Sequence, residues 1–410
     1  KREALSEAGL QSARCMPLNG KWRFRLYPNH QKRPEGFADP NFRAAGYNTI
    51  EVPGSWQMQG YGVPQYCNMQ YPWEGKEEPV PPYAPVETNP VGCYLKSFQL
   101  PVAWAEKRVF LRFEGVESAF YLFVNGNRIG YAENSFDPSE FELTAFLHPG
   151  KNLIGVEVYR WCTGSWLEDQ DFWRMSGLFR SVELFTKPEI HLEDVFVKQD
   201  FAPDFSSATV TFDCKVSGAG TISVVFDGEE QSAEVGEPAE YDSGVVFGKG
   251  EADPDVEEDV QDVSFTFTVE HPTLWSAEQP NLYEAEIALL NEGALVERTG
   301  LKVGLRKFEL KERQMLLNGK RIVFKGVNRH EWSCRTGRTV SREEMLWDVK
   351  NLKAHNVNAV RTSHYPQSPA FLDACDELGL LVFTEMPGWQ HIGDEAWKAQ
   401  ALQNCREMVC

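Results

Sequence analysis

The last hundred residues of this 410-residue chain alternate between strand and helix patterns, and this order restricts how they can fold. Short apolar runs predict strands at residues 321–327, 357–360 and 380–384. The third run is nearly all apolar, which predicts a strand buried on both faces. Between the first two, Ser341 and Glu344 have the spacing of a capping box that opens a helix. Pro369 opens a second predicted helix, which ends at Gly379. Strands separated by helices pair in parallel through right-handed crossovers, so an α/β domain is predicted to begin near residue 308.

Residues 1–307 show strand patterns and turns without helical patterns between them. Trp22 and Phe24 alternate with charged residues, as in a half-buried strand, and Asn125-Gly126 predicts a tight hairpin. Further strands are predicted at residues 208–212, 221–226, 263–269 and 283–290. We therefore expect a jelly-roll β-sandwich over residues 1–187, followed by an immunoglobulin-like β-sandwich over residues 188–307.

The charge of the chain excludes two classes of partner. Its 41 Lys and Arg stand against 60 Asp and Glu, which gives a net charge of −19 and a pI of about 5.0. A surface this acidic repels phosphate backbones and anionic lipids, so neither nucleic acid nor a membrane is an expected partner. The longest apolar runs are also much shorter than the roughly 20 residues that span a bilayer. A neutral ligand remains open, and the 12 Trp and 13 Tyr suit sugar rings as well as the core of a β-sandwich.

Cysteine usage and the amino-terminal residues bear on the compartment. The nine cysteines form no C-x-x-C pair and have no regular spacing, which favours reduced thiols over a disulfide framework or a zinc site. The first eight residues are polar and lack the apolar stretch of a signal peptide. Both features predict a cytoplasmic protein.

Chemically versatile side chains follow each of the three predicted parallel strands. His330 follows the first strand, and Glu385 follows the third. Arg361 and His364 follow the second. The carboxyl ends of parallel strands meet at one edge, where α/β barrels place their active sites. We expect a catalytic face there, although any one of these residues alone is as well explained by a structural hydrogen bond. The two histidines lack a carboxylate at ligand spacing, which favours contacts with sugar hydroxyls over a shared metal.

A second candidate site lies in the loop of residues 161–174. Its carboxylates and aromatic residues are Glu168, Asp169, Asp171, Trp161, Trp166 and Trp173. Carboxylates accept hydrogen bonds from hydroxyl pairs, and flat aromatic faces stack on sugar rings, so this composition suits a carbohydrate pocket. The alternative, weighted equally, is a loop held in place by pairing of an Asp with Arg174.

Five motifs are spread over nearly the whole chain. They are NPVGCY at 89–94, LEDQD with WRMSG at 167–177, LWSAEQPNLY at 274–283, GVNRHE at 326–331 and NAVRTSHYP at 358–366. Together these motifs resemble glycoside hydrolase family 2, in particular its large bacterial β-galactosidases.

The resemblance implies a fold and a reaction. The implied domains are a jelly-roll sugar-binding domain (1–187), an immunoglobulin-like β-sandwich (188–307) and the first part of a (β/α)₈ TIM barrel (308–410). His330 and His364 would contact sugar hydroxyls and stabilise the transition state. Asp171 would reach the galactose from the first domain, and Arg361 would orient catalytic carboxylates. The implied reaction is retaining hydrolysis of terminal β-D-galactosides by two carboxyl groups about 5–5.5 Å apart. β-Glucuronidase and β-mannosidase activities remain alternatives.

The chain departs from the family pattern at two places. The family's acid/base and nucleophile glutamates follow the third barrel strand, and neither is found before Cys410. We therefore expect an amino-terminal portion that holds no catalytic glutamate and is inactive by itself; a non-catalytic carbohydrate-binding or scaffold protein is the alternative. Trp389 stands where the galactosidases carry a magnesium-binding carboxylate, which leaves His391 alone, so no cofactor is expected. For the full-length protein we expect a small β-galactoside or oligosaccharide as ligand, and a homo-oligomer.

Overall fold

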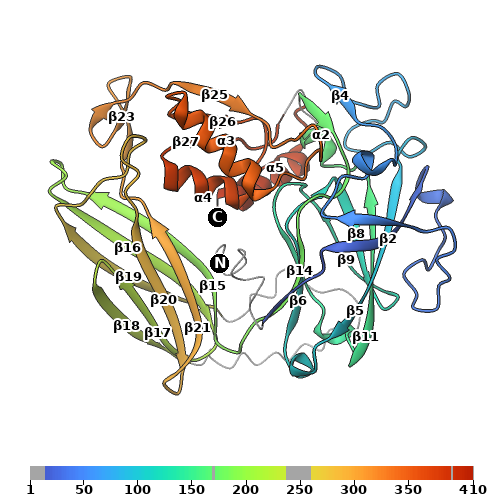
Figure 1. The fold of residues 1–410 in the computed structure, drawn as a ribbon, viewed down its shortest axis with the longest axis horizontal. Coiled ribbons are helices and arrows are strands. Elements are labelled where there is room, and N and C mark those ends of the chain that lie inside the picture. The colour runs from blue at the N-terminus through green and yellow to red at the C-terminus, as the bar shows by residue number, and fades with distance from the viewer. Residues whose placement is uncertain (1–13, 169–170, 237–259, 389–390, 410) are drawn as a thin grey trace. The chain divides into compact units, whose positions relative to one another are not determined.

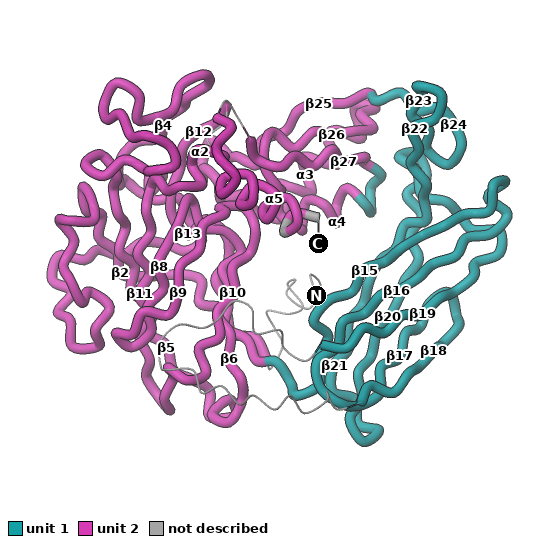
Figure 2. The backbone as a smooth tube through the Cα atoms, turned by 180° about the vertical axis from the view of Figure 1, so that it is seen from behind, with its two compact units in different colours: residues 1–9, 187–324, 376–379 teal, residues 10–186, 325–375, 380–410 magenta. Residues whose placement is uncertain are grey.

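The computed structural model describes residues 14–168, 171–236, 260–388 and 391–409. Two compact units are distinguished by their internal packing (Figure 1 and Figure 2). Among the described residues, the sandwich unit comprises 187–324 and 376–379, and the larger unit comprises 14–186, 325–375 and 380–409. Each unit is built around a hydrophobic core of its own.

The first domain of the larger unit has two main antiparallel sheets. One has the strand order β1 (Cys15–Pro17), β14 (Val182–Thr186), β6 (Val109–Phe113), β10 (Ser139–Glu142). The other has the order β3 (Asn48–Val52), β2 (Gly20–Tyr27), β5 (Val91–Leu100), β11 (Gly150–Tyr159), β8 (Ala119–Val124), β9 (Asn127–Glu133). Two short pairs, β12 (Phe172–Arg174) with β4 (Gln65–Cys67) and β13 (Gly177–Leu178) with β7 (Val116–Glu117), accompany the single-turn helix α2 (Ser165–Glu168).

The core of this domain follows the predicted alternation. Trp22 and Phe24 are buried between the sheets, while Lys21 and Arg23 on the same strand are exposed. Asn125 and Gly126 have φ angles of 51° and 87°, the positive values that a type I′ turn between β8 and β9 requires. The alternation and the hairpin are therefore confirmed, and so is the two-sheet sandwich that they predict.

The sandwich unit consists of two antiparallel sheets and a small three-stranded sheet. The strands of one sheet are β15 (His191–Phe201), β16 (Ser207–Ser217) and β19 (Val260–Glu270). The second has the order β18 (Glu229–Val235), β17 (Gly220–Phe226), β20 (Tyr283–Asn291), β21 (Ala294–Val303). The small sheet is formed by β22 (Phe308–Lys311), β23 (Gln314–Leu317) and β24 (Lys320–Arg321). Rings of Phe212, Phe226 and Phe267 meet in the core at centroid separations of 5.3 to 5.8 Å, as expected of an immunoglobulin-like sandwich.

The remaining part of the larger unit is the predicted α/β stretch. Its elements are β25 (Gly326–Arg329), α3 (Arg342–Ala354), β26 (Ala359–Thr362), α4 (Pro369–Leu378), β27 (Leu381–Phe383) and α5 (Glu395–Val409). The three strands pair in parallel in sequence order. The capping box is present, with Ser341 and Glu344 each accepting from the other's backbone N–H at 3.2 Å. Gly379 follows α4 with a φ of 82°, which confirms it as the stop of that helix.

Two expectations for this stretch were wrong. Residues 321–327 do not form one strand: residues 320–321 pair antiparallel with β23, and the parallel strand begins at Gly326. The apolar pattern does not mark this break, because Asn358, far along the chain, accepts a hydrogen bond from the N–H of Lys325 and fixes the start of the pairing. The third strand is not buried on both faces either, since Phe383 at its end is 41% exposed.

None of the helices in the described ranges has the length and apolar character that crossing a bilayer requires.

Candidate functional site

The residues that follow the three parallel strands lie at the same edge of the sheet. Arg329 lies opposite Thr362, and Arg361 lies opposite Phe383, so the strands end nearly level with one another. The rings of His330 and His364 consequently lie 5.7 Å apart, centroid to centroid, at an interplanar angle of 83°. The structure thus brings the two predicted histidines together.

His364 is held by a carboxylate that follows the third strand. Its Nδ1 lies 2.7 Å from Oε2 of Glu385. The other carboxylate oxygen, Oε1, accepts from Nε of Arg361. Nη2 of Arg361 lies 3.2 Å from the same Nδ1. In the tautomer that donates from Nδ1 to Glu385, Nε2 is an acceptor for a ligand hydroxyl. Arg361, expected to orient catalytic carboxylates, here orients Glu385.

Glu385 is the site residue to which the sequence assigned no role. Its backbone N–H donates to the hydroxyl of Thr362 at 3.2 Å, and that hydroxyl donates to the carbonyl of Phe383 at the same distance. The sequence signal that could have identified Glu385 as a site residue is its position directly after a predicted strand. Its pairing with His364 cannot be predicted from neighbouring residues, because it depends on the register of two strands.

His330 has an electrostatic environment that keeps it neutral. The pKa of its imidazole is lowered to about 4, chiefly by partial desolvation, then by the positive charge of Arg338 and by His364. Asp171 acts in the opposite direction on the same ring. At neutral pH, His330 is therefore an uncharged imidazole that can donate or accept a hydrogen bond.

Asp171 comes to this edge from the first domain. It precedes β12, which pairs with β4 so that Trp173 lies opposite Tyr66. The Tyr66 hydroxyl donates to Asp171, and this hydrogen bond is the main cause that raises the pKa of Tyr66. Arg174, the partner in the alternative interpretation of this loop, has its guanidinium carbon 4.5 Å from the centroid of the Phe172 ring. Asp169, the other aspartate of the predicted pairing, lies outside the described residues.

Three further residues of the predicted loop, Trp161, Trp166 and Glu168, are part of the core. Glu168 is buried and accepts from the N–H and the hydroxyl of Ser135 at 2.7 and 2.6 Å. Burial raises its pKa to about 8. Trp161 and Trp166 pack with Tyr71 and Trp73 in a buried cluster. Of the predicted loop residues, Asp171 acts electrostatically on His330, and Trp173 stacks on Trp332, which follows His330 by two positions.

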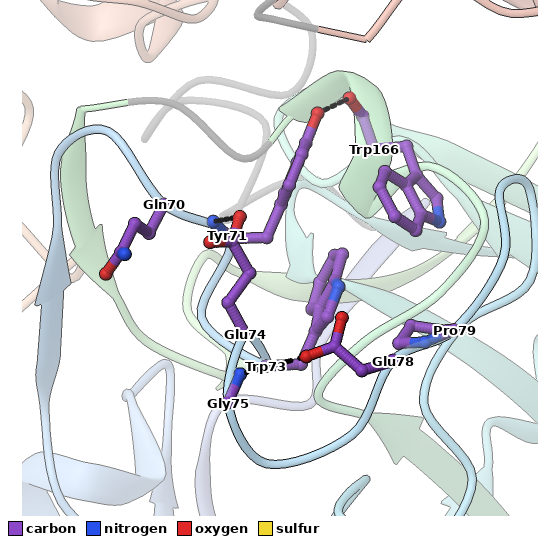
Figure 3. Close-up of a pocket in the computed structure, with 8 residues that line it drawn as sticks. All are labelled: Gln70, Tyr71, Trp73, Glu74, Gly75, Glu78, Pro79 and Trp166. Atoms are coloured by element: carbon purple, nitrogen blue, oxygen red, sulfur yellow. Dashed lines mark hydrogen bonds between the residues drawn. The ribbon is translucent and has the colours of Figure 1, made fainter.

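A hollow of 380 Å³ borders that buried cluster. Its lining residues are Gln70, Tyr71, Trp73, Glu74, Gly75, Glu78, Pro79 and Trp166 (Figure 3). The indoles of Trp73 and Trp166 lie 5.0 Å apart, and the Tyr71 hydroxyl donates to the Trp166 carbonyl at 3.2 Å. With Trp73 2% and Trp166 6% exposed, these rings fill the core of the loop and offer little stacking face.

A buried network fixes the loops that carry these residues. Arg338 contacts Oε2 of Glu117 at 3.3 Å, the Tyr365 hydroxyl at 2.5 Å and the Trp173 carbonyl at 2.7 Å. The Tyr365 ring stacks on Phe136 at 4.2 Å. First-domain and strand-end residues are therefore joined through one guanidinium.

The position where the galactosidases carry a magnesium-binding carboxylate is not described, since Trp389 lies outside the described residues. The ring of His391 lies 5.4 Å from Trp166 and 5.9 Å from Trp397. Among the residues that the structure describes, no three His, Cys, Asp or Glu side chains gather as metal ligands would.

Fold and site together define the class of protein. Parallel strands of barrel type end in polar side chains, and a β-sandwich domain adds a carboxylate to the same edge. The fold is that of a multidomain β and α/β protein, and the carboxyl ends of parallel strands are where α/β barrels carry their active sites.

Comparison with family models identifies the family. The model "Glycosyl hydrolases family 2, sugar binding domain" matches residues 15–188, "Glycosyl hydrolases family 2" matches 190–306, and "Glycosyl hydrolases family 2, TIM barrel domain" matches 308–406. The chain belongs to glycoside hydrolase family 2. The resemblance and the predicted fold class are confirmed, while the domain boundaries at 187/188 and 307/308 stay predictions.

Curated relatives and solved structures resemble the chain over most of its length. The β-galactosidase of Streptococcus thermophilus is 43% identical over 395 residues, covering 94% of this chain and 37% of that protein. That of Halalkalibacterium halodurans is 45% identical over 382 residues, covering 92% and 36%. A β-glucuronidase structure from Bifidobacterium dentium has a TM-score of 0.76 at 23% identity, covering 97% of this chain and 66% of its own. The chain thus spans little more than a third of the length of these curated relatives.

Proposed function

We propose that this chain supplies the sugar-contacting part of a retaining glycosidase that acts on terminal β-D-galactosides. The observation that carries the proposal is the meeting of His330 and His364 at one strand edge, where Asp171 acts electrostatically on His330. The choice of galactose is supported by curated relatives that are β-galactosidases at 43% and 45% identity over more than nine-tenths of the chain. The expected ligand is a small β-galactoside or oligosaccharide.

Each residue has a proposed role in this reaction. His364, oriented by Glu385, accepts a hydroxyl hydrogen bond through Nε2, and neutral His330 makes a second contact. Asp171 accepts from a further hydroxyl. Positive charge develops on the sugar ring in the transition state, so hydroxyl contacts that strengthen there lower the barrier. Arg361 acts through Glu385 and is a positioning residue. The proposal assigns neither the acid/base nor the nucleophile to a residue of this chain.

The cytoplasmic location remains part of the proposal. Cys93, Cys162 and Cys214 are buried free thiols, which suits a reducing compartment. Assembly into a homo-oligomer stays a prediction.

The activity is tested with p-nitrophenyl glycosides of galactose, glucuronic acid and mannose on the intact gene product that contains this chain. We expect kcat/KM to be highest for the β-galactoside. A preference for the glucuronide or the mannoside would refute the galactose assignment and leave the family unchanged.

The role of His364 is tested by His364→Ala in the same protein. We expect kcat to fall roughly 10²-fold and KM to rise much less, because the contact strengthens in the transition state. His30→Ala, an exposed histidine of the first domain, is the matched control. Unchanged kinetics for His364→Ala would remove the residue from the site.

A further inference from the structure

A hollow of 520 Å³ over strands β2, β5 and β11 of the first domain gathers positive charge. Four basic side chains line it: Lys21 and Arg23 from β2, Lys96 from β5 and Lys151 from β11. Among the described residues that line this hollow, none is Asp or Glu. The chain as a whole has a net charge of −19, so the charge of this hollow is opposite to that of the molecule. We call it the basic hollow.

The register of the sheet gives the basic hollow an apolar floor. Arg23 lies opposite Leu95, and Leu153 lies opposite Ser97. Leu95 is buried, Leu153 is half-buried, and Phe42 borders them from the loop that precedes β3. Pockets for small ligands have volumes of roughly 300–1,000 Å³ and combine an apolar lining with a few polar groups. The basic hollow has this size and this composition.

The cations of the basic hollow have no acidic partners in the described parts of the chain, whereas other cations of the same domain do. Arg33 pairs with Glu157 at 2.6 Å, and Arg112 pairs with Glu114 at 2.8 Å. Positive charges that line one hollow repel one another, and an anion between them replaces this repulsion with attraction. The basic hollow is therefore complementary to a negative charge.

Two of the cations are held in place by backbone carbonyls. Nη2 of Arg23 donates to the carbonyl of Ala44 at 2.6 Å, and Nζ of Lys96 donates to the carbonyl of Lys21 at 3.0 Å. Both groups keep further N–H donors, and donors that are already oriented lose little freedom when a ligand binds. Partial burial lowers the pKa of Lys96, and the charge of Glu51 opposes this effect. An anion in the basic hollow would further stabilise this ammonium.

We propose that the basic hollow binds a small organic anion, namely a phosphate or sulfate group carried on a compact ring-shaped body. The basic side chains hold the oxyanion by charge-assisted hydrogen bonds, and the apolar floor packs against the body. The net negative charge of the chain repels large polyanions, but at physiological salt a charge acts over only about 8 Å, so the local cations decide for a small ligand. The basic hollow shares no residue with the strand-end site, and the inference goes beyond the proposed function.

Calorimetric titration of the intact gene product tests the inference. The probes are phenyl phosphate, phenyl sulfate and benzyl alcohol, which has the ring without the charge. We expect the Kd of the better anionic probe to be at least about 10-fold lower than that of benzyl alcohol and to rise with added salt. Which anionic probe binds more tightly distinguishes a phosphate ligand from a sulfate ligand.

Lys21→Gln and Lys151→Gln remove charge from the basic hollow. Both lysines are exposed, so the fold should be unaffected. Each change should raise the Kd of the anionic probe about 3–5-fold, and the double variant about 10-fold or more. Lys151→Arg, which keeps the charge, should stay within about 2-fold of wild type. Lys32→Gln, an exposed lysine of the same domain outside the basic hollow, is the matched control and should leave the Kd unchanged.

Three results would overturn the inference. Without measurable binding of either anionic probe, the intact protein does not offer the basic hollow to a ligand. If Lys32→Gln weakens binding as much as Lys151→Gln, the effect is one of overall charge. If a saturating thioglycoside of the preferred sugar displaces the anionic probe, the probe occupies the strand-end site. A preference for glucuronides or mannosides would refute the galactose assignment and would not change the expected result for the basic hollow.

Discussion

Glu168 and Asp171 show that the surroundings of a carboxylate determine whether it is buried or available to a ligand. Both are carboxylates of one short acidic segment. Glu168 is enclosed, and its hydrogen bonds come from Ser135, whereas Asp171 is partly open and bonds to Tyr66. Composition alone predicted that both suit a carbohydrate pocket. The strand pairing that separates them, β4 with β12, is set by residues a hundred positions earlier in the chain.

The raised pKa of Glu168 predicts a pH-dependent stability. In the folded protein this carboxyl titrates near 8 against an ordinary 4.5, so the native state keeps a proton that the unfolded chain releases between these values. The contribution of the protonated carboxyl to the free energy of unfolding is fully present below pH 4.5 and is lost as the pH rises through 8. Glu168→Gln should remove this loss. The unfolding free energy of Glu168→Gln minus that of wild type should therefore be about 2–4 kcal/mol larger at pH 8.5 than at pH 5.

Urea unfolding at the two pH values measures the effect. Glu35→Gln, an exposed carboxyl, serves as control and should show no such difference. Parallel curves for Glu168→Gln and wild type would mean that Glu168 is ionised in the folded protein.

Glu385 is predicted to act by orienting His364. Glu385→Gln keeps the shape but replaces a charged acceptor, so kcat/KM of the intact gene product should fall roughly 10–100-fold, the equivalent of one charged hydrogen bond. The loss should lie in kcat more than in KM, because the contact that His364 makes strengthens in the transition state. Steady-state kinetics separate the two constants. Glu395→Gln, on the exposed side of α5, is the control, and a change in KM with kcat unchanged would argue against an orienting role for Glu385.

At the scale of elements, the strand-end loops depend on one buried guanidinium. Arg338 pairs with Glu117 across 221 positions of sequence and donates to Tyr365, the residue that follows His364. Arg180 adds a 2.9 Å contact to Glu331, next to His330. The loops after β25 and β26 are thus fixed by the first domain.

Removing Arg338 should leave a buried charge without its partner. Arg338→Met is expected to destabilise the protein by about 3–5 kcal/mol, because Glu117 then remains enclosed without its ion-pair partner. Burial already raises the pKa of Glu117, and the Arg338 charge is the largest opposing influence. Adding Glu117→Gln to Arg338→Met should restore a measurable part of the loss.

Denaturant unfolding of the four members of this double-mutant cycle gives the coupling between the two residues. Strictly additive single effects would contradict a direct pairing. A reduced m-value in Arg338→Met would indicate instead that the loops have become disordered.

Elements with local rules were predictable, and those that rely on distant partners were not. The Asn125-Gly126 turn, the capping box at Ser341 and the parallel order of the last strands follow from neighbouring residues. The meeting of His330 with His364 follows from that order. The start of β25 does not, because Asn358 sets it. The contacts of Glu385 with His364 and of Tyr66 with Asp171 also depend on the register between strands. That register cannot be predicted from neighbouring residues in a single sequence.

At the scale of the whole molecule, the two units differ in how self-contained they are. The core of the sandwich unit is made of its own strands, from Ile190 to Leu305. The α/β stretch instead shares a core cluster with the first domain, in which Tyr365 packs with Phe136, Phe172 and Phe179. Its three strands are also fewer than the eight that close a barrel.

This difference predicts how separated segments behave. Residues 188–307 produced alone should fold, with a single cooperative urea transition and the far-ultraviolet circular dichroism of a β-protein, because their apolar side chains bury one another. Residues 308–409 alone should not, since Tyr365 and Arg338 would lose Phe136 and Glu117, and an open edge would remain on β27. Residues 187–324, which add the small sheet β22–β24, are the matched control and should unfold in the same transition as residues 188–307. If residues 188–307 are disordered while residues 187–324 fold, the predicted boundary moves from 307 to the end of the small sheet. If residues 308–409 fold cooperatively by themselves, the strand-end loops do not depend on the first domain.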